Sequence, residues 1–522
     1  MRNLKLEELS VEQKIGMVLC ARNFSYDDEE NLEFTFDLIR NHALGCVQVP
    51  YKKPDIIKKI KEIADYPILM ILDMEMGFPT SQLPPVPMMS LSACDKPEYY
   101  QAFARAMVTD AINAGCNGCW GPVIDIQQGA FGVYRKFSDD PERVAYAAEQ
   151  IAQVLANNHF MSCGKHFPGA DGSGVDGHMA PSDSPSTKED LVNTKMIPYR
   201  YLMKKGLLPS IMVDHKTIPA VDPDYPASLS KKVIDLIRQE GYDGVCFTDS
   251  FGMMAILQKY GEENVLGLAM AAGNDIVLPN YRISNKANYE YLLKNYQDGM
   301  FSEERLNEAV RRVLALQAYV GAQPEKPDLF TEKDREVYYA IAKDCITAVN
   351  DPGVDAALDA DNKDRLFVVL TESNSAADEL AQEMVTRPWY DPQGIIKKIG
   401  EEFPEAEVVT LPEFPTAKQN EHVLLAASRH KEVVFVSFCN YRPYLGTDCL
   451  TRRAEAMINA LNLNGKLSAI VHFGNPYVLQ NVNHISRKIF GYMMPQSQGH
   501  AIEVLAGKLE AKGKLPFNVE FK

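Results

Sequence analysis

The chain has 522 residues, more than the roughly 250–300 at which a single hydrophobic core stops growing, so we expect two domains. Hydrophobic residues make up 46% and charged residues 24%, proportions that exclude a disordered or fibrous chain. Because 70 acidic residues outnumber 54 basic ones, the net charge is −16, which repels phosphate backbones and anionic lipid. We therefore expect neither nucleic acid nor a membrane as a partner.

Residues 1–24 mix charged and apolar side chains where a signal peptide needs an unbroken apolar stretch, and they predict an amphipathic helix that Ser10 enters. No apolar run approaches the ~18–20 residues of a membrane span. Most of the 10 cysteines stand singly in apolar segments, as reduced thiols do, so we expect a cytoplasmic protein. Cys116 and Cys119 form a C-x-x-C without a second pair or a nearby histidine, which indicates packing thiols.

Short apolar runs alternate with amphipathic stretches between about residues 40 and 280. The runs, which we expect to form strands, lie at 45–49, 68–73, 116–125, 160–167, 210–214, 244–249 and 274–279. Uniformly apolar strands that alternate with helices are typical of a parallel sheet buried on both faces. Seven runs within about the ~250 residues of a barrel favour a (β/α)8 TIM-like barrel. An open doubly wound sheet is the alternative, but no G-x-G-x-x-G follows any run.

A stretch rich in proline and charge, 322–333, precedes a second alternation of helices and strands. Its apolar runs lie at 366–370, 407–410, 432–438, 468–473 and 487–492. This pattern predicts a smaller α/β unit, an αβα sandwich. We therefore predict a TIM-barrel catalytic domain at 1–321, a linker at 322–345 and a C-terminal αβα sandwich domain at 346–522. In this second domain we expect His430 and His472 to be satisfied core or edge histidines without a catalytic role.

Ionisable residues stand where the apolar runs of the first half end. They are Asp73, Asp125, Lys165, His166, Asp214, His215 and Asp249. In a barrel the carboxyl ends of all strands lie on one face, where the loops build the active site. The pattern therefore predicts a site at that face.

The glycine-rich loop 165–183 carries Asp176 and His178 as a D-x-H pair. A phosphate-binding loop, a metal site, an acid–base pair and a plain solvated loop are all compatible with it, although the phosphate-loop motif G-x-x-x-x-G-K-[ST] is absent. In the acid–base interpretation the carboxylate orients the imidazole and stabilises its protonated form. Asp249 follows a buried strand, and a carboxylate there is compatible with a metal ligand, a base or a covalent nucleophile.

Motifs along nearly the whole chain resemble those of glycoside hydrolase family three. In order, they are ELSVEQKIGMVL at 8–19, KHFPG at 165–169, the D-x-H of Asp176 and His178, IMVDH at 211–215, GYDGVCFTDSFGM at 241–253, AMAAGNDIVL at 269–278, HFGNPYVL at 472–479 and GKLPFNV at 513–519. The D-x-H loop resembles that of the bacterial two-domain β-N-acetylglucosaminidase branch. One such motif alone is weak evidence, but this many in order are specific.

The resemblance implies the roles of individual residues. Asp249 would be the nucleophile that forms a glycosyl-enzyme, and His178, held by Asp176, would protonate the leaving oxygen and later deprotonate water. The positions implied to contact substrate are Asp73, Arg135, Lys165, His166, His215 and Met253. The resemblance implies no cofactor and no metal ion, and a small carbohydrate or glycoside as substrate.

Several positions depart from the family pattern. The usual D-Q-E-G-G-R-V-x-R is D-M-E-M-G-F-P-T-S at 73–81, so Phe78 and Ser81 replace both arginines. The usual S-D-D is Thr248-Asp249-Ser250, which keeps only the first aspartate. The catalytic residues are thus retained while the surrounding residues differ, which bears on the substrate more than on the chemistry.

The resemblance implies a retaining exo-acting β-N-acetylhexosaminidase, a β-N-acetylglucosaminidase that acts on a small glycoside such as a cell-wall fragment in recycling. The alternatives are a β-glucosidase-type glycosidase, a glycoside phosphorylase, and a sugar-binding protein whose catalysis has decayed. Phosphorolysis is compatible with an imidazole acid, which tolerates an anionic acceptor better than a carboxylate would because no like-charge repulsion arises. The sequence predicts no particular oligomeric state.

Overall fold

The computed structural model describes residues 1–129, 132–170, 174–322, 324–372, 390–439 and 449–522. The chain divides into two compact units. The barrel unit consists of Met1–Phe78, Ala104–Ile126 and Asp140–Phe330, and the sheet unit consists of Pro79–Phe103, Gln127–Asp139 and Thr331–Lys522. Both units are thus discontinuous in sequence, whereas the predicted domains are continuous. Part of the predicted linker forms helix α14, Glu332–Asp344.

The barrel unit is built on two four-stranded parallel sheets, in the orders β1-β2-β3-β4 and β10-β9-β6-β5. The strands are β1 Cys20–Ala21, β2 Cys46–Gln48, β3 Leu69–Leu72, β4 Gly118–Cys119, β5 Cys163–Phe167, β6 Ser210–Val213, β9 Val245–Ser250 and β10 Ile276–Leu278. Isolated parallel bridges between Leu19 and Val277 and between Gly118 and Met161 join the two sheets at both sides. The strands therefore close into a ring whose carboxyl ends share one face.

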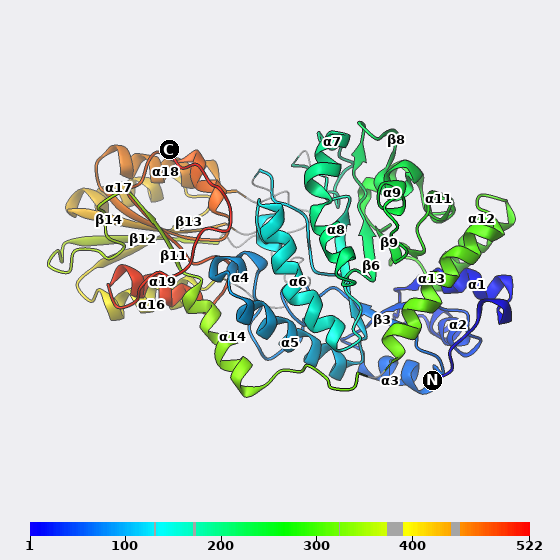
Figure 1. The fold of residues 1–522 in the computed structure, drawn as a ribbon. Helices are drawn as coiled ribbons and strands as arrows, with labels where there is room; N and C mark the ends of the chain where they lie inside the picture. The colour runs from blue at the N-terminus through cyan, green and yellow to red at the C-terminus, as the bar shows by residue number, and fades with distance from the viewer. Residues whose placement is uncertain (130–131, 171–173, 323, 373–389, 440–448) are drawn as a thin grey trace. The chain divides into compact units, whose positions relative to one another are not determined.

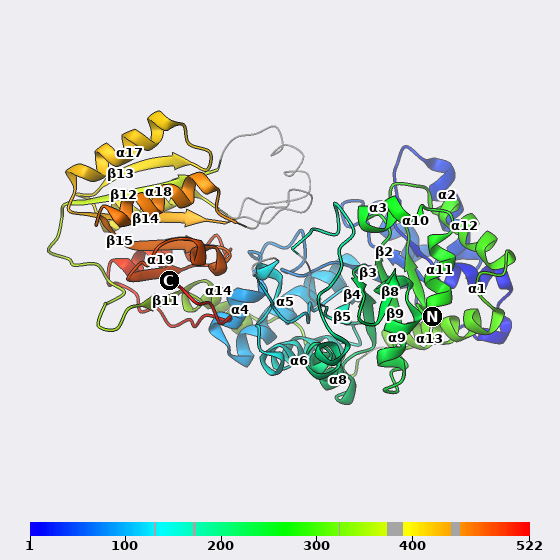
Figure 2. The same cartoon turned by 90° about the horizontal axis from the view of Figure 1, so that it is seen from above.

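Helices surround these strands, as Figure 2 shows. They are α1 Val11–Met17, α2 Glu29–Arg40, α3 Pro54–Ile63, α6 Pro141–Asn157, α7 Lys188–Asp190, α8 Ile197–Lys204, α9 Lys231–Arg238, α10 Met254–Tyr260, α11 Val265–Ala272, α12 Asn285–Gln297 and α13 Glu303–Gly321. Helix α5, Pro97–Ala114, contributes residues to both units. A short antiparallel hairpin of β7, Thr217–Ile218, and β8, Asp222–Pro226, follows β6.

Local sequence signals explain where these elements begin and how closely they pack. Ser10 caps α1 with a capping box that includes Gln13, as the predicted helix start at Ser10 requires. The last turn of α1 lies against the residues that precede β2, where Gly45 N–H donates to Gly16 O at 3.0 Å. A Cβ at Gly16 would lie 1.7 Å from the Ala43 carbonyl oxygen, so only glycine fits there. Inside the ring, Trp120 packs edge-on against Phe247 in the buried core.

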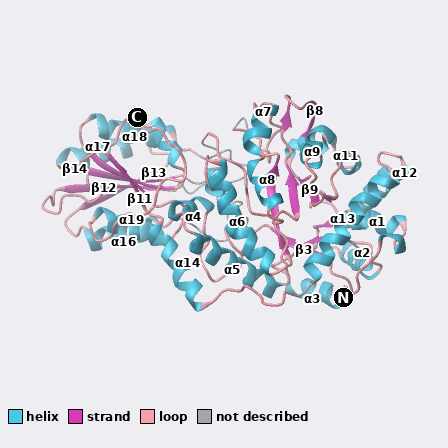
Figure 3. Ribbon diagram, in the orientation of Figure 1, coloured by secondary structure: helices cyan, strands magenta, loops and turns pink. Residues whose placement is uncertain are grey.

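The sheet unit contains a six-stranded sheet in the order β11-β16-β15-β14-β12-β13, in which β11 is antiparallel to β16 and the other pairs are parallel. Its strands are β11 Thr347–Asn350, β12 Arg365–Thr371, β13 Glu407–Pro412, β14 Glu432–Phe438, β15 Leu467–Phe473 and β16 Arg487–Phe490. Its helices are α4 Met88–Cys94, α14, α16 Pro392–Glu402, α17 Ala417–Arg429, α18 Arg452–Leu463 and α19 Ser497–Leu505. Figures 1 and 3 show α17 and α18 on one side of the sheet and α16 and α19 on the other.

All seven predicted runs of the first half overlap a barrel strand, and all five of the second half overlap a strand of the six-stranded sheet. The strands β1, β7, β8 and β11 have no counterpart among the predicted runs. The loop 165–183 is described except for residues 171–173. The amphipathic segment DELAQEMVT at 378–386, whose spacing predicts a helix between two strands of the second half, lies outside the described residues. Among the helices of the described ranges, none has the length and apolar character that crossing a membrane requires.

Candidate active site

Asp249 lies on β9, one residue before the strand ends, with its side chain only 19% exposed. The backbone N–H of Ser250 donates to Asp249 Oδ1 at 2.6 Å, and His166 Nε2 lies 4.0 Å from Asp249 Oδ2. Burial alone would raise the pKa of Asp249, but the neighbouring His166, the Ser250 N–H and Lys165 outweigh it and lower the pKa to about 2. The carboxylate is therefore ionised and available as a nucleophile at neutral pH.

The ammonium group of Lys165 joins the ends of two barrel strands. Lys165 Nζ, on β5, lies 2.7 Å from Asp73 Oδ1 and 2.7 Å from Glu75 Oε1, just beyond β3. The lysine side chain is only 3% exposed, whereas that of Asp73 is 53% exposed. Asp73 is thus held in place by a buried cation while its carboxylate still faces solvent.

His166 is oriented by Asp125, which follows β4. Asp125 Oδ1 accepts from the His166 backbone N–H at 2.8 Å, and its Oδ2 lies 2.8 Å from His166 Nδ1. Because a carboxylate only accepts hydrogen bonds, Nδ1 carries the proton and Nε2 is directed toward Asp249. The strand ends thus bring Asp73, Lys165, His166 and Asp249 together, as the sequence predicts.

The D-x-H pair forms the dyad that its spacing suggests. Asp176 Oδ1 accepts from the backbone N–H of His178 at 2.9 Å and lies 2.7 Å from His178 Nδ1. The Asp176 side chain is 2% exposed and that of His178 is 34% exposed, so a buried carboxylate orients an accessible imidazole. Ala255 N–H donates to Gly177 O at 3.2 Å, and the Met253 methyl group packs beside Gly177. Met253 therefore supports the loop through α10.

His215 is buried, and both of its ring nitrogens bond to the protein. Nδ1 lies 2.8 Å from Ser228 Oγ and Nε2 lies 3.0 Å from the Ser250 carbonyl oxygen, while the ring stacks on Phe251 at 5.2 Å. Burial lowers the pKa of His215. A sugar hydroxyl can bond to a ring nitrogen here only if one of these bonds breaks, so the observed position is that of a support for β9.

Arg135 ends the short helix η2, Val133–Arg135, which belongs to the sheet unit. Its contact with substrate stays a prediction. Sequence reasoning missed Arg22, which follows β1 and bonds to Ser250 Oγ at 2.5 Å. The signal that identifies it is its position at a strand end, but β1 has only two residues and has no counterpart among the predicted runs.

Within the described ranges, no group of three or more histidine, cysteine or acidic side chains is arranged to hold a metal ion. Cys116 and Cys119 are both buried, and burial raises the pKa of Cys116 to about 12. A thiol with so high a pKa is neither a ready nucleophile nor a ready metal ligand. The C-x-x-C pair is therefore a packing feature, as predicted.

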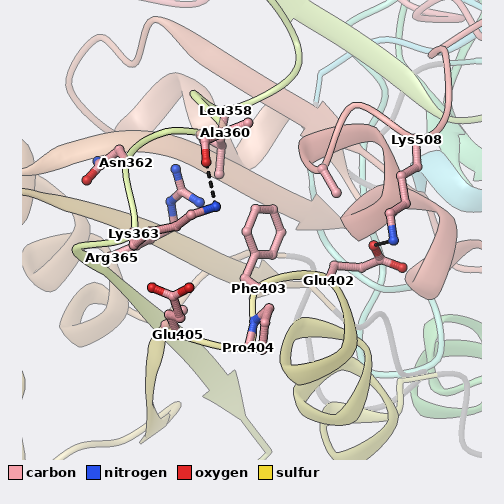
Figure 4. Close-up of a pocket in the computed structure, with 12 residues that line it drawn as sticks. Leu358, Ala360, Asn362, Lys363, Arg365, Glu402, Phe403, Pro404, Glu405 and Lys508 are labelled. Atoms are coloured by element: carbon pink, nitrogen blue, oxygen red, sulfur yellow. Dashed lines mark hydrogen bonds and ion pairs between the residues drawn. The ribbon is translucent and has the colours of Figure 1, made fainter.

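Figure 4 shows a pocket in the sheet unit, and none of the predicted site residues lines it. Phe403 stands at its centre, with Lys363 on one side and Glu402 with Lys508 on the other. Lys508 Nζ pairs with Glu402 Oε2 at 2.6 Å, and Lys363 Nζ donates to a backbone carbonyl at 2.6 Å. Because these charges are satisfied within the protein, we retain the barrel mouth as the candidate active site.

Comparison with known proteins agrees with this geometry. The chain matches the family described as "Glycosyl hydrolase family 3 N terminal domain" over residues 50–316, more than half of its length. The chain therefore belongs to glycosyl hydrolase family 3, which confirms the resemblance that its motifs predicted and implies a carbohydrate substrate.

Curated relatives and solved structures narrow the comparison. A "Beta-N-acetylglucosaminidase/beta-glucosidase" of Cellulomonas fimi is 23% identical over 60% of this chain and 59% of its own length. A "Beta-hexosaminidase" of Xanthomonas oryzae pv. oryzae is 30% identical over 42% of this chain and 69% of its own length. The matches thus span about 60–70% of these relatives. The structure of a family 3 β-N-acetylglucosaminidase from Paenibacillus sp. str. FPU-7 has a TM-score of 0.79 at 24% identity and covers 98% of this chain and 100% of that one, which shows the same fold.

Proposed function

We propose that this chain is a retaining, exo-acting β-N-acetylhexosaminidase that hydrolyses a terminal β-linked amino sugar through a covalent glycosyl-enzyme. The observation that carries the proposal is the combination of an ionised Asp249 at a barrel-strand end with His178, whose Nδ1 is held by the buried Asp176. Retaining hydrolysis requires a nucleophile and an acid–base group. The activities named for the family relatives support the choice of an amino sugar.

The two groups act in sequence. Asp249 attacks the anomeric carbon as the bond to the leaving oxygen breaks, and His178 Nε2 gives its proton to that oxygen. In the second step Nε2 takes a proton from water, whose oxygen displaces the Asp249 carboxylate from the sugar. Asp176 stabilises the imidazolium before the first transfer and after the second, so one histidine serves both steps.

The remaining predicted residues divide into two groups. Asp73, Lys165 and His166 bind sugar hydroxyls, and contacts that tighten as the ring flattens toward the oxocarbenium ion lower the barrier. His215 and Met253 act as supports, since the first holds Ser250 O and the second packs on the D-x-H loop. We assign the barrel unit to the (β/α)8 class and the sheet unit to the αβα sandwich class.

Two variants test these roles on aryl β-N-acetylglucosaminides. Asp249→Asn removes the nucleophile at constant volume, and kcat should fall by about 10³-fold or more. His178→Ala should lose much more activity with a poor leaving group than with 2,4-dinitrophenolate, which departs without a proton. His422→Ala, exposed on α17, is the matched control and should be fully active. Wild-type turnover in both site variants with an intact fold would overturn the assignment.

Phosphorolysis is the second candidate, because the acid–base group is an imidazole and does not repel phosphate as a carboxylate would. Assaying products with and without inorganic phosphate separates the two reactions, since only phosphorolysis yields a sugar 1-phosphate. A panel of aryl N-acetylglucosaminide, glucoside, N-acetylgalactosaminide and xyloside then tests the choice of sugar. Preference for the glucoside would replace the amino-sugar assignment with a β-glucosidase one.

A further inference from the structure

A single guanidinium group, that of Arg22, ties together the carboxyl ends of four barrel strands. Arg22 follows β1. Its Nε donates at 2.6 Å to Oε1 of Gln48, which is the last residue of β2. Its Nη1 donates at 2.5 Å to Oγ of Ser250, which is the last residue of β9. The same nitrogen donates at 3.0 Å to the carbonyl oxygen of Pro279, which lies just beyond β10. The Tyr281 ring lies 5.1 Å from the guanidinium carbon.

These bonds lie where the ring of strands is joined most weakly. The strands β1 and β10 are connected by one isolated bridge, between Leu19 and Val277, rather than by a ladder. Arg22 bonds across this seam at the mouth of the barrel, directly beside the strand that carries Asp249. Removing its side chain therefore frees the end of β9 from β1 and β2, while the ladder between β9 and β10 remains.

The bonding of Ser250 passes this restraint to Asp249. Ser250 donates its backbone N–H to Asp249 Oδ1 at 2.6 Å, its carbonyl oxygen lies 3.0 Å from His215 Nε2, and its hydroxyl is held by Arg22. The residue after Asp249 is thus fixed at its nitrogen, oxygen and side chain. A carboxylate whose neighbour is fixed in this way has little freedom to rotate away from an approaching anomeric carbon.

The charge of Arg22 is also unusual, because all three acceptors of its hydrogen bonds are neutral. Within the described residues no carboxylate lies within ion-pair distance of the guanidinium. Burial lowers the pKa of Arg22, and Asp73 and Asp249 act in the opposite direction. Where the family pattern has a second aspartate, this chain has Ser250, so the positive charge is not cancelled locally and acts on Asp249.

We propose that Arg22 is a positioning residue for the proposed nucleophile: it fixes Asp249 through Ser250 and favours its ionised form through its charge. The inference rests on the function proposed above for Asp249. It assigns a role to a residue that lies outside the sequence motifs of the site and needs no contact between Arg22 and the sugar.

Three variants separate the anchor from the charge, with aryl β-N-acetylglucosaminide as substrate. Arg22→Met removes both the hydrogen bonds and the charge. Because Asp249 is then less well positioned, kcat should fall about 10- to 100-fold, with KM changed less than about threefold. Because the positive charge no longer favours the ionised carboxylate, the acid limb of the pH profile of kcat/KM should move to higher pH. Arg22→Lys keeps the charge and should restore the acid limb but only part of kcat. Ser250→Ala loses the anchor alone, so kcat should fall with the acid limb unmoved.

Arg40→Met, on the exposed face of α2, is the matched control and should behave as wild type. Circular dichroism and thermal melting check the fold of each variant; should Arg22→Met fail to fold, the lysine and Ser250→Ala variants still decide. A rise in KM at constant kcat in Arg22→Met would mean that Arg22 binds substrate, and wild-type kinetics would mean that it does nothing; either result overturns the inference. An inactive wild-type enzyme would instead overturn the proposed function.

Discussion

His472 predicts a measurable pH dependence of stability in the sheet unit. It lies on β15 with no exposed surface; Nδ1 is 2.8 Å from Ser437 Oγ, and Nε2 is 2.9 Å from the Asn475 carbonyl oxygen. Because that oxygen only accepts, Nε2 carries the proton and the neutral ring is satisfied. Burial lowers the pKa of His472 from 6.5 to about 3, and the bond to Asn475 opposes this only in part.

The sign follows from proton uptake. Between pH 6.5 and about 3 the unfolded chain is protonated at His472 and the folded chain is not. The stability that the neutral, buried ring contributes to the folded state is therefore fully present above pH 6.5 and decreases as the pH falls below that value. At ~1.4 kcal/mol per pH unit for one proton, lowering the pH from 7 to 5 should remove about 2 kcal/mol from the free energy of unfolding.

His472→Gln removes this titration. Protection factors from native-state hydrogen exchange in β14 and β15 at pH 5 and pH 7 give the opening free energy of this sheet, and the wild type should lose about 2 kcal/mol more than the variant between the two pH values. His422→Gln, exposed on α17, is the control and should follow the wild type. Equal pH dependence in wild type and His472→Gln would refute the reasoning, because it would mean that the ring titrates no differently when folded.

Two further predictions concern packing and thiol exposure. Gly16→Ala places a Cβ 1.7 Å from the Ala43 carbonyl oxygen and should lower the melting temperature and soluble yield, whereas Gly400→Ala, with nothing within 4 Å, should lower neither. Cys449 is exposed, whereas burial raises the pKa of Cys116 to about 12, so a thiol reagent on the native protein should show one fast phase that Cys449→Ser abolishes. A fast phase that survives Cys449→Ser would show that a second thiol is accessible.

The strands were predictable where burial makes them uniformly apolar. The runs 68–73 and 210–214 contain β3 and β6, which are buried along their whole length. The run 116–125 contains only the two-residue β4, although its composition is that of a longer strand. Pro122 lacks the N–H that a continued ladder requires, and the chain resumes contact with β5 through a single bridge at Val123.

The geometry of the candidate site was predictable to the extent that strand ends define it. The positions of Asp249 and of the Asp176–His178 dyad follow from one strand and one short spacing, both local features of the sequence. His215 shows the limit, because it stands at a strand end like the others, yet its nitrogens bond to Ser228 and Ser250. The direction in which a strand-end side chain points depends on packing that sequence spacing does not carry.

Arg22 shows the same limit from the opposite side. A strand of two residues has no period, so nothing in its sequence marks β1 as a strand, and Arg22 reaches the site only because the ring closes between β1 and β10. In a closed barrel the carboxyl ends of all the parallel strands lie at the same mouth. An arginine at the end of one strand can therefore supply there the positive charge that the family pattern places at the end of another. Phe78 and Ser81 stand where the family pattern has arginines, and Arg22 places a guanidinium whose charge acts on Asp73 and Asp249. Departures from a family motif therefore have to be judged over the whole ring of strand ends rather than within the motif alone.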